Sequence, residues 1–283
     1  MPAALAGECG PSVIAAMAAT DMSQLSIATA WHVRPHLSCG LVKPTLIITH
    51  LPDRQDGIVR QALEAAGCAV ITRNPDDAEP LPAAREVAGV VTLGGRQSAT
   101  RVAQDAFLRA EVELLQDALQ QEVPVLGMCL GAQLLAVAAG GAVSYAGRMN
   151  TGWPELSLLP AAAGDPLFRA FPAHLPVLKW HEDIIEMPSD ATELGTTPGP
   201  GAALFRVGAS AWGSQAHLEL TPAMLIEGWT SDPADIAEIE GAGHRIEEFR
   251  AQSRSHLVTQ MAAARPMFTA FGELATSCAS SPA

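Results

Sequence analysis

The sequence predicts an α/β protein with an open, mostly parallel sheet that is covered by helices on both faces. Short apolar runs rich in β-branched residues alternate with stretches whose apolar residues recur at helical spacing. Strands that are apolar throughout belong in a sheet buried on both faces, because a half-exposed strand would alternate apolar with polar residues. The chain has 283 residues, 48% of them hydrophobic and 17% charged, which is sufficient for a sizeable core.

The alternation is clearest in the first half of the chain. "PTLIITH" (44–50) predicts a strand, and "GIVRQALEAAG" (57–67) predicts a helix that ends at a glycine. The amphipathic stretch "DAFLRAEVELLQDALQQ" predicts a helix over 105–121. The other elements predicted here are strands at 68–73, 87–95 and 124–128 and a helix at 131–141.

Beyond Gly141 the pattern changes to strands that extend or flank the sheet. The stretch 191–208 contains a "PGPG" turn, which predicts two strands joined at that turn. From Thr221 onward, "TPAMLIEGW" and the two stretches on either side of "GAGHR" predict helices. The other strands are predicted within 142–147, 151–159, 175–180 and 209–217.

One domain is expected, over residues 44–274, because no internal repeat and no Gly/Ser linker divides that range. Residues 1–43 are predicted to be a poorly ordered N-terminal extension, and the Ser- and Ala-rich residues 275–283 a flexible tail. The extension lacks the basic segment of a signal peptide. No run approaches the roughly 18 apolar residues of a membrane helix, so we expect no membrane partner.

Charge and cysteine content narrow the function classes. The chain has 17 Lys plus Arg against 30 Asp plus Glu, a formal net charge of −13, which argues against a nucleic-acid partner. The five cysteines are scattered and show no C-x-x-C spacing, which argues against a disulfide framework and a metal site and suits a reducing cytoplasm. They are Cys9, Cys39, Cys68, Cys129 and Cys278.

Cys129 lies in "VLGMCLGA", a G-x-C-x-G pattern at the junction of a predicted strand and helix. The pattern matches a nucleophile elbow, in which a sharp turn holds the reactive side chain above the sheet and small residues must flank it. At the start of a helix, unpaired N–H groups favour a thiolate over a thiol. The N–H of Leu130 is then placed to stabilise an oxyanion.

Among eight histidines, His217 stands apart because Glu219 follows two residues later, after an apolar strand. Positions two apart on an extended segment face the same side, so Glu219 can orient the imidazole while His217 accepts a proton from Cys129. Most of the other histidines are expected at the surface or in loops. Gly94 and Gly95, at the end of an earlier strand, are candidates for the second oxyanion N–H.

Taken together, these motifs resemble the class I glutamine amidotransferases, and most of all the free-standing GMP-synthetase-like branch. The resemblance covers about 44–219 and includes "TPAMLIEGW". It rests on the glycine pair "LGG", the C-x-G-x-Q elbow, the Q-x-H-x-E strand end, "TGWPELSL", and the loop "KWHEDIIEMP". The matching elbow and strand-end residues are Cys129, Gly131, Gln133, Gln215, His217 and Glu219.

The resemblance implies a flavodoxin-like fold, no cofactor, and hydrolysis of the γ-amide of glutamine through a thioester, with the ammonia passed to a separate synthetase subunit. It implies that Cys129 is the nucleophile, His217 the general base and then acid, and Glu219 the orienting carboxylate. Gly95 and Leu130 would supply the oxyanion N–H groups. The substrate-binding residues it implies are Gly94, Gln133, Gln215, His181 and Asp183.

The sequence departs from the family where Leu218 replaces a usual proline, Glu182 a usual glycine, and Ala132 a residue that is often His or aromatic. Two alternatives therefore stay open: a γ-glutamyl amide or peptide hydrolase without ammonia transfer, and a catalytically degenerate binding or regulatory subunit.

Two other enzyme classes fit the sequence less well. A dienelactone-hydrolase-like enzyme would carry its acid well before the histidine, and a papain-like protease would need a different setting for its cysteine. The only lysines, Lys43 and Lys179, are not part of a phosphate-binding loop.

Overall fold

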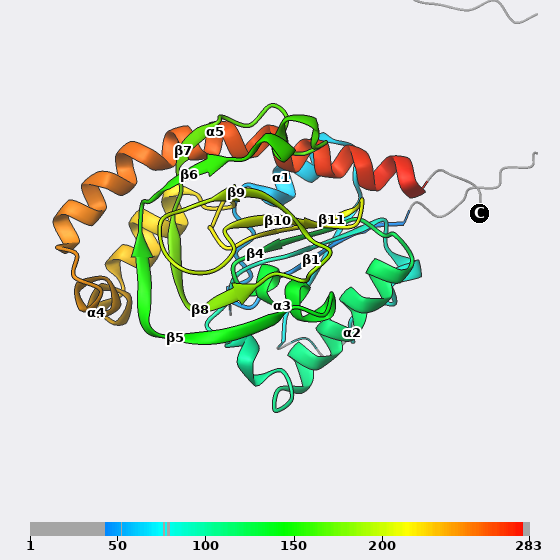
Figure 1. Ribbon diagram of the computed structural model, residues 1–283, viewed down its shortest axis with the longest axis horizontal. Coiled ribbons are helices and arrows are strands. Elements are labelled where there is room, and N and C mark those ends of the chain that lie inside the picture. Colours follow the sequence, from blue (N-terminus) through cyan, green and yellow to red (C-terminus); the bar gives the residue numbers. More distant parts are fainter. Residues whose placement is uncertain (1–42, 52, 76, 78–79, 280–283) are drawn as a thin grey trace, which may run out of the picture. The chain divides into compact units, whose positions relative to one another are not determined.

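A nine-stranded sheet organises the chain in the strand order β2-β1-β3-β4-β11-β10-β9-β6-β7 (Figure 1). The computed structural model describes residues 43–51, 53–75, 77 and 80–279. Five neighbouring strands pair in parallel, which confirms the predicted α/β class. They are β1 (Thr45–Ile48), β2 (Val70–Arg73), β3 (Gly89–Thr92), β4 (Val125–Met128) and β11 (Ala211–Ser214).

The rest of the sheet is antiparallel and comes from the region where the sequence pattern changes. The "PGPG" turn joins two of these strands, as the sequence predicts. The strands are β10 (Leu204–Val207), β9 (Thr192–Thr196), β6 (Glu155–Leu158) and β7 (His174–Pro176). Short helical turns lie in the connections, namely η1 (Ala84–Glu86), η2 (Ala99–Arg101) and η3 (Pro160–Gly164).

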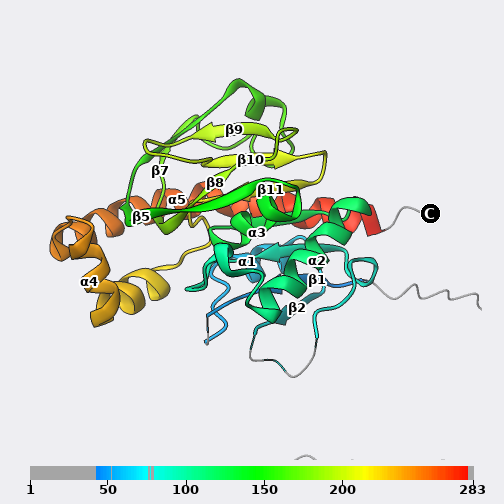
Figure 2. The same ribbon diagram turned by 60° about the horizontal axis from the view of Figure 1, so that its bottom comes forward.

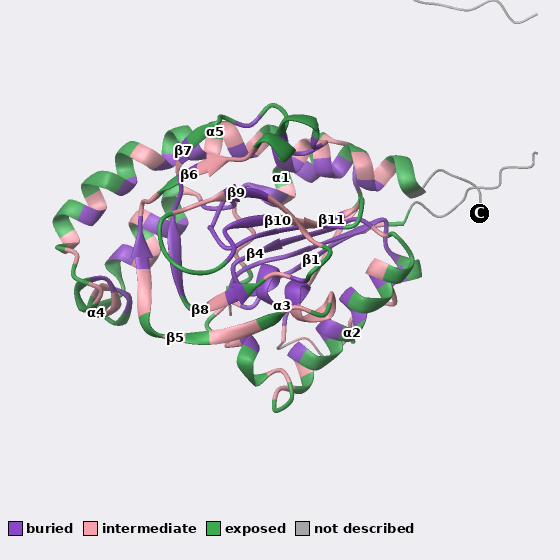
Figure 3. Ribbon diagram, viewed as in Figure 1, coloured by how far each residue is buried: buried purple, intermediate pink, exposed green. Residues whose placement is uncertain are grey.

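Helices cover both faces of the parallel strands. On one face, α1 (Val59–Ala65) and α5 (Ile246–Ala279) pack over the side chains of Ile47, Val91 and Leu126. On the other face, α2 (Ala106–Gln120) and α3 (Leu130–Ala138) pack over Leu46, Val90 and Val125. The central strands β1, β3 and β4 are buried along their whole length, whereas the edge strand β2 is half-buried (Figure 3). Burial on both faces explains why the central strands are continuously apolar.

A separate two-stranded ribbon pairs β5 (Ala142–Gly152) with β8 (Lys179–Glu186) in antiparallel fashion (Figure 2). The sequence analysis treats "KWHEDIIEMP" as a loop, and the structure corrects this, because His181 and Asp183 lie on β8. Most residues of β8 are buried, and their pairing partners on β5 stand 27 (Gly152 and Lys179) to 44 (Ala142 and Glu186) residues earlier in the chain. The charged residues of this segment suggest a loop, but pairing with β5, which is distant in the sequence, makes it a strand.

The C-terminal region is helical, as predicted, but in forms that the sequence does not show. "TPAMLIEGW" forms a π-helix, η4 (Ala223–Gly228), followed by a 3₁₀ turn, η5 (Trp229–Ser231). Asp232 caps the next helix, α4 (Pro233–Gly241). Helix α5 continues through Ala279, so residues 275–279 are helical rather than part of a tail. Residues 1–42 and 280–283 of the predicted extension and tail lie outside the described residues.

Candidate active site

Cys129 occupies the sharp turn between β4 and α3. Its backbone has φ 50° and ψ −107°, a conformation that is strained for any residue with a side chain. Two hydrogen bonds hold the turn: the Cys129 N–H donates to the Ser214 carbonyl at 2.8 Å, and the Gln133 N–H donates to the Cys129 carbonyl at 3.0 Å. The structure therefore has the elbow geometry that G-x-C-x-G predicts.

The two glycines of the elbow are required by close backbone contacts. A Cβ on Gly127 would lie 2.6 Å from the carbonyl group of Gly131, and a Cβ on Gly131 would lie 2.2 Å from the Thr92 carbonyl oxygen. Both distances are far shorter than real Cβ contacts, and both involve backbone atoms that cannot rotate away. The elbow therefore fits only if both positions lack a side chain.

Replacing Gly131 with alanine is expected to lower the free energy of unfolding by about 1–3 kcal/mol and to remove activity, because the added methyl must push β3 and the elbow apart. Urea unfolding together with a turnover assay measures both effects. Gly241→Ala is the matched control, since a Cβ there meets nothing within 4 Å at the end of a helix. A Gly131→Ala protein as stable and active as this control would contradict the close contact.

His217 and Glu219 are buried together beside the elbow. The Nδ1 atom of His217 lies 2.7 Å from Oε1 of Glu219, and the two residues are 4% and 2% exposed. The backbone of this segment is held at both ends: the Ile58 N–H donates to the Glu219 carbonyl at 2.9 Å, and the Gln260 side chain donates to the His217 carbonyl at 2.8 Å. With Nδ1 engaged by Glu219, Nε2 is the ring nitrogen left for Cys129.

The charges around His217 favour its protonated form. Burial lowers the pKa of the imidazole, but the neighbouring charges of Cys129 and Glu219 and their hydrogen bonds outweigh burial and raise the pKa well above 6.5. A histidine with a raised pKa can accept a proton from a thiol and keep it until a leaving group needs it. The electrostatics of the site therefore suit a thiolate–imidazolium pair.

The segments that carry the predicted oxyanion donors border Cys129. A Cβ on Gly94 would come within 2.6 Å of the His217 ring and 3.5 Å of the Cys129 Cβ, so this glycine sits against both residues. Leu130 is the first residue of α3, where helix geometry leaves the N–H without a partner inside the helix. Among the described backbone groups, none accepts a hydrogen bond from the N–H of Gly95. The turn that carries Gly94 and the first turn of α3 thus both border Cys129.

Trp180 and Trp229, to which the sequence assigns no role, complete the surroundings of Cys129 and His217 together with the predicted Gln215. The thiol donates to the Trp180 carbonyl at 3.6 Å, and the Gln215 amide donates to Sγ at 3.8 Å. The Trp229 ring packs edge-on against the His217 ring, with centroids 5.2 Å apart. Tryptophan in "KWHED" and "EGW" was a visible signal, but its contact with the triad depends on pairing and helix packing that local sequence does not show.

Polar groups converge on the other side of the thiol, on β8 and α3. The Asp183 carbonyl accepts from His181 Nδ1 at 2.8 Å and from the Gln133 amide at 3.4 Å, and its carboxylate accepts from Ser98. Among the described side chains, His181 Nε2 and Gln215 Oε1 are buried and make no hydrogen bond. Unpaired buried polar atoms beside a cavity are suited to bind a ligand's donors.

His181 is expected to make stability depend on pH. Burial, followed by the charge of Lys179, lowers its pKa to about 4. The unfolded state, with a pKa near 6.5, therefore binds a proton that the folded state does not bind between these values. This stabilisation is complete above about pH 6.5 and is lost as the pH falls toward 4, by up to about 3 kcal/mol. Urea unfolding at pH 7.5 and 4.5 should show a smaller loss for His181→Gln, and equal losses would contradict the shift.

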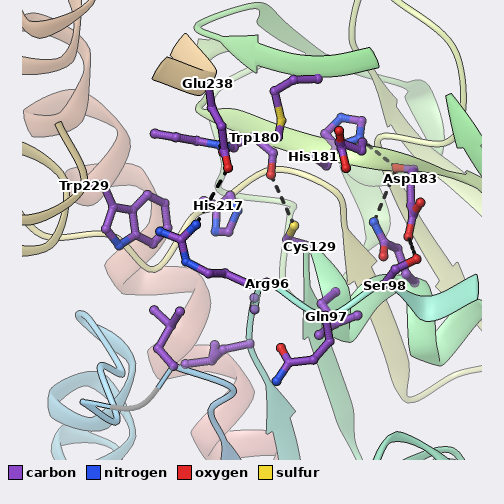
Figure 4. Close-up of a pocket in the computed structure, with 18 of the residues that line it drawn as sticks. Arg96, Gln97, Ser98, Cys129, Trp180, His181, Asp183, His217, Trp229 and Glu238 are labelled. Atoms are coloured by element: carbon purple, nitrogen blue, oxygen red, sulfur yellow. Dashed lines mark hydrogen bonds and ion pairs between the residues drawn. The ribbon is translucent and has the colours of Figure 1, made fainter. Parts of the chain in front are cut away.

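These residues line one cavity of about 510 Å³ (Figure 4). Every predicted site residue lines it except Gln215, which is buried behind the thiol. Arg96, Trp229 and Glu238 lie on one side of Cys129, and Ser98 and Asp183 on the other. Of the family departures, Leu218 and Ala132 are fully buried in the core, and Glu182 is exposed at the cavity's edge.

The described residues contain no group of three or more His, Cys, Asp or Glu side chains arranged to hold a metal ion. None of the helices described is both long and apolar enough to cross a membrane.

Comparison with known proteins gives consistent matches. The model of the family "Glutamine amidotransferase class-I" matches residues 55–225. The chain is 32% identical to the glutamine amidotransferase-like protein YfeJ of Salmonella typhimurium over 143 residues, which cover 50% of this chain and 60% of YfeJ. It is 34% identical to the glutamine-hydrolysing GMP synthase of Streptococcus mutans over 47% of this chain and 25% of that enzyme. The chain thus matches less than two thirds of the length of these relatives.

A search of solved structures finds the same fold. A glutamine amidotransferase from Thermotoga maritima superposes with a TM-score of 0.71 and 25% identity, covering 82% of this chain and 99% of that one. A glutamine amidotransferase from Methylobacillus flagellatus, 24% identical, gives a TM-score of 0.70 over 81% of this chain and 94% of that one. These likenesses confirm the predicted flavodoxin-like arrangement.

Proposed function

Because the chain belongs to the class I glutamine amidotransferase family, we propose that it hydrolyses the γ-amide of glutamine through a thioester on Cys129. The observation that carries the proposal is the strained Cys129, which lines a cavity together with the buried His217–Glu219 pair. A non-glycine residue keeps a strained backbone conformation only where the surrounding structure holds it, and such residues are most frequent at active and binding sites.

In this mechanism the Cys129 thiolate attacks the amide carbon, a C–S bond forms, and the π electrons move to the oxygen. The oxyanion is stabilised by the N–H groups of Gly95 and Leu130. Protonated His217 gives its proton to the nitrogen as the C–N bond breaks, so ammonia leaves. His217 then removes a proton from water, which attacks the thioester and releases glutamate. Glu219 holds the imidazole and stabilises its charged form.

The substrate's amino-acid end is assigned to the side of the cavity that contains Gln133, His181 and Asp183. The Asp183 carboxylate is the natural counter-charge for an α-ammonium group. His181 is neutral at pH 7, and its unpaired Nε2 can accept a hydrogen bond. Gly94 allows the substrate to approach the loop closely, and Gln215 supports the thiol from behind.

We further propose that a separate synthetase subunit in the cytoplasm consumes the ammonia. The relatives include glutamine-hydrolysing GMP synthases, and this sequence has no phosphate-binding G-x-x-x-x-G-K-[ST] loop. The free thiols among the described residues, Cys68, Cys129 and Cys278, suit a reducing compartment.

One observation favours a second candidate, a hydrolase of larger γ-glutamyl amides. The cavity extends past the thiol to Arg96, Trp229 and Glu238, on the side away from Asp183 (Figure 4). Ammonia needs no room there, whereas a substituted amide would place its amine in that space.

The test is the release of glutamate and amine from L-glutamine and from γ-glutamyl-methylamide by the purified chain. Turnover of L-glutamine supports the main proposal. A strong preference for the substituted amide supports the second candidate. Turnover of neither substrate, by a chain whose Cys129 is still alkylated rapidly by iodoacetamide, would favour the degenerate binding or regulatory subunit.

A further inference from the structure

A second buried histidine–carboxylate pair lies beneath the loop that carries Gly94 and Gly95. His50 follows β1, and its Nε2 atom lies 2.7 Å from Oε2 of Glu111 on α2, with both side chains fully buried. Thr92, at the end of β3, donates its hydroxyl hydrogen to the other oxygen of Glu111. His50 is the last residue of the predicted strand 44–50, and the sequence assigns it no functional role.

The other ring nitrogen of His50 contacts the glycine loop. Nδ1 lies 3.1 Å from the Leu93 carbonyl oxygen, and because a carbonyl can only accept, Nδ1 carries the hydrogen. The Gly94 carbonyl also interacts with the ring. A Cβ on Gly95 would lie 2.4 Å from the His50 Cβ, so the loop rests directly on this side chain.

The protonation state of His50 supports donation from both nitrogens. Burial lowers its pKa, but the charge of Glu111 and the hydrogen bonds to Glu111, Leu93 and Gly94 outweigh burial and raise it. A buried ion pair of this kind adds little net stability compared with apolar residues of the same size. Its value therefore lies in the geometry that it imposes.

We propose that His50 is a positioning residue that holds the carbonyl groups of Leu93 and Gly94 so that the N–H of Gly95 faces the oxyanion. In a trans peptide the C=O and N–H point in opposite directions, so a Gly94 carbonyl held toward His50 turns the Gly95 N–H away from His50. Gly94 itself packs against Cys129, so this loop borders the thiol. Two successive glycines have wide backbone freedom, and an outside clamp is needed to select one orientation. The inference rests on the proposed acyl chemistry at Cys129.

Two variants of His50 separate this role from a purely structural one. In His50→Asn the amide nitrogen stands near the position of Nδ1, so it keeps the bond to Leu93 and leaves Oε2 of Glu111 buried without its histidine partner. In His50→Gln the amide nitrogen stands near the position of Nε2, so it keeps Glu111 paired and releases the loop. His50→Gln should therefore have the higher melting temperature, whereas His50→Asn should hold the glycine loop in the wild-type orientation.

The readout is the ratio of two reactions at Cys129, each corrected with Cys129→Ala. Acylation by p-nitrophenyl acetate forms a C–S bond through an oxyanion and expels p-nitrophenolate, whereas alkylation by iodoacetamide displaces iodide and forms no oxyanion. The acylation rate of His50→Gln is expected to fall about 10²-fold, as it does when one oxyanion donor is lost. Its alkylation rate should not change. His50→Asn is expected to keep most of its acylation rate while melting at a lower temperature.

Acylation rates that follow melting temperature, with His50→Gln faster than His50→Asn, would overturn the inference. If His50→Asn does not fold, Glu111→Gln replaces it. Its amide can donate a hydrogen bond to His50 Nε2, so His50 Nδ1–H still donates to the Leu93 carbonyl. Loss of acylation in Glu111→Gln would likewise overturn the proposal. Neither reagent contains a γ-glutamyl group, so failure of L-glutamine turnover in wild type counts only against the proposed substrate. Such a failure is therefore distinguishable from failure of the clamp.

Discussion

Cys129→Ala is expected to lower the rate of γ-amide hydrolysis by at least about 10⁴-fold, because members of a catalytic triad act as a unit and the thioester cannot form without the sulfur. The fold should tolerate the change, since the side chain removed is small and its Sγ lies at long distances of 3.6 and 3.8 Å from the Trp180 carbonyl and the Gln215 amide. Glutamate release, measured with a coupled dehydrogenase, gives the rate. Urea unfolding checks that the protein is intact.

Cys278→Ala is the matched control, because this thiol is exposed near the end of α5. It should leave turnover unchanged. Alkylation adds an independent comparison with Cys68, whose thiol pKa is raised by burial, so Cys68 should react slowly with iodoacetamide near neutral pH. Substantial turnover by Cys129→Ala would refute the thioester route, whatever the alkylation pattern.

The elbow could be predicted from sequence because its determinants are local. Gly127, Cys129 and Gly131 stand within five residues, and the contacts that exclude side chains at the glycines arise from the turn itself and the neighbouring strand. The pair of His217 and Glu219 is local in the same sense, because alternate residues of an extended segment share a face. Local patterns of this kind predict how the side chains are arranged without any information on residues that are distant in the sequence.

Other parts of the site depend on long-range packing. Gln260 on α5 accepts from the Leu178 N–H at 2.9 Å and donates to the His217 carbonyl at 2.8 Å, although it stands 43 residues beyond that histidine. Nothing near Gln260 in the sequence marks it, because its role depends on where α5 crosses the sheet. His50 was missed for the same reason, since its partner Glu111 stands 61 residues away.

The strand β8 shows how pairing overrides local composition. Glu182 and Asp183 are charged, as residues of a solvated loop often are, yet β5 residues on both sides of the register shift between Tyr145 and Asn150 pair with β8. That pairing places His181 and Asp183 in the cavity on one face of the ribbon and exposes Glu182. The structure therefore brings His181 and Asp183 into one cavity, by a strand and not by a loop.

Glu219→Gln is expected to reduce turnover by about 10²–10⁴-fold while changing the size of the side chain very little. Glu219 accepts from His217 Nδ1 at 2.7 Å, and its backbone carbonyl is held by Ile58, so the position itself should not move. A glutamine amide can donate to Nδ1. The ring hydrogen would then be on Nε2, and a protonated Nε2 cannot accept the proton of Cys129. The charge that stabilises the imidazolium would also be lost.

The consequence can be measured by the pH dependence of Cys129 alkylation. Cys129 and Glu219 together outweigh burial and raise the pKa of His217 well above 6.5, so in wild type His217 keeps its proton until the pH rises through that raised pKa. Removing the carboxylate lowers the pKa of His217, and the fraction of thiolate paired with imidazolium should fall near neutral pH. Glu113→Gln, an exposed carboxylate on α2, is the control and should match wild type. Equal turnover by Glu219→Gln and this control would show that His217 is oriented without Glu219.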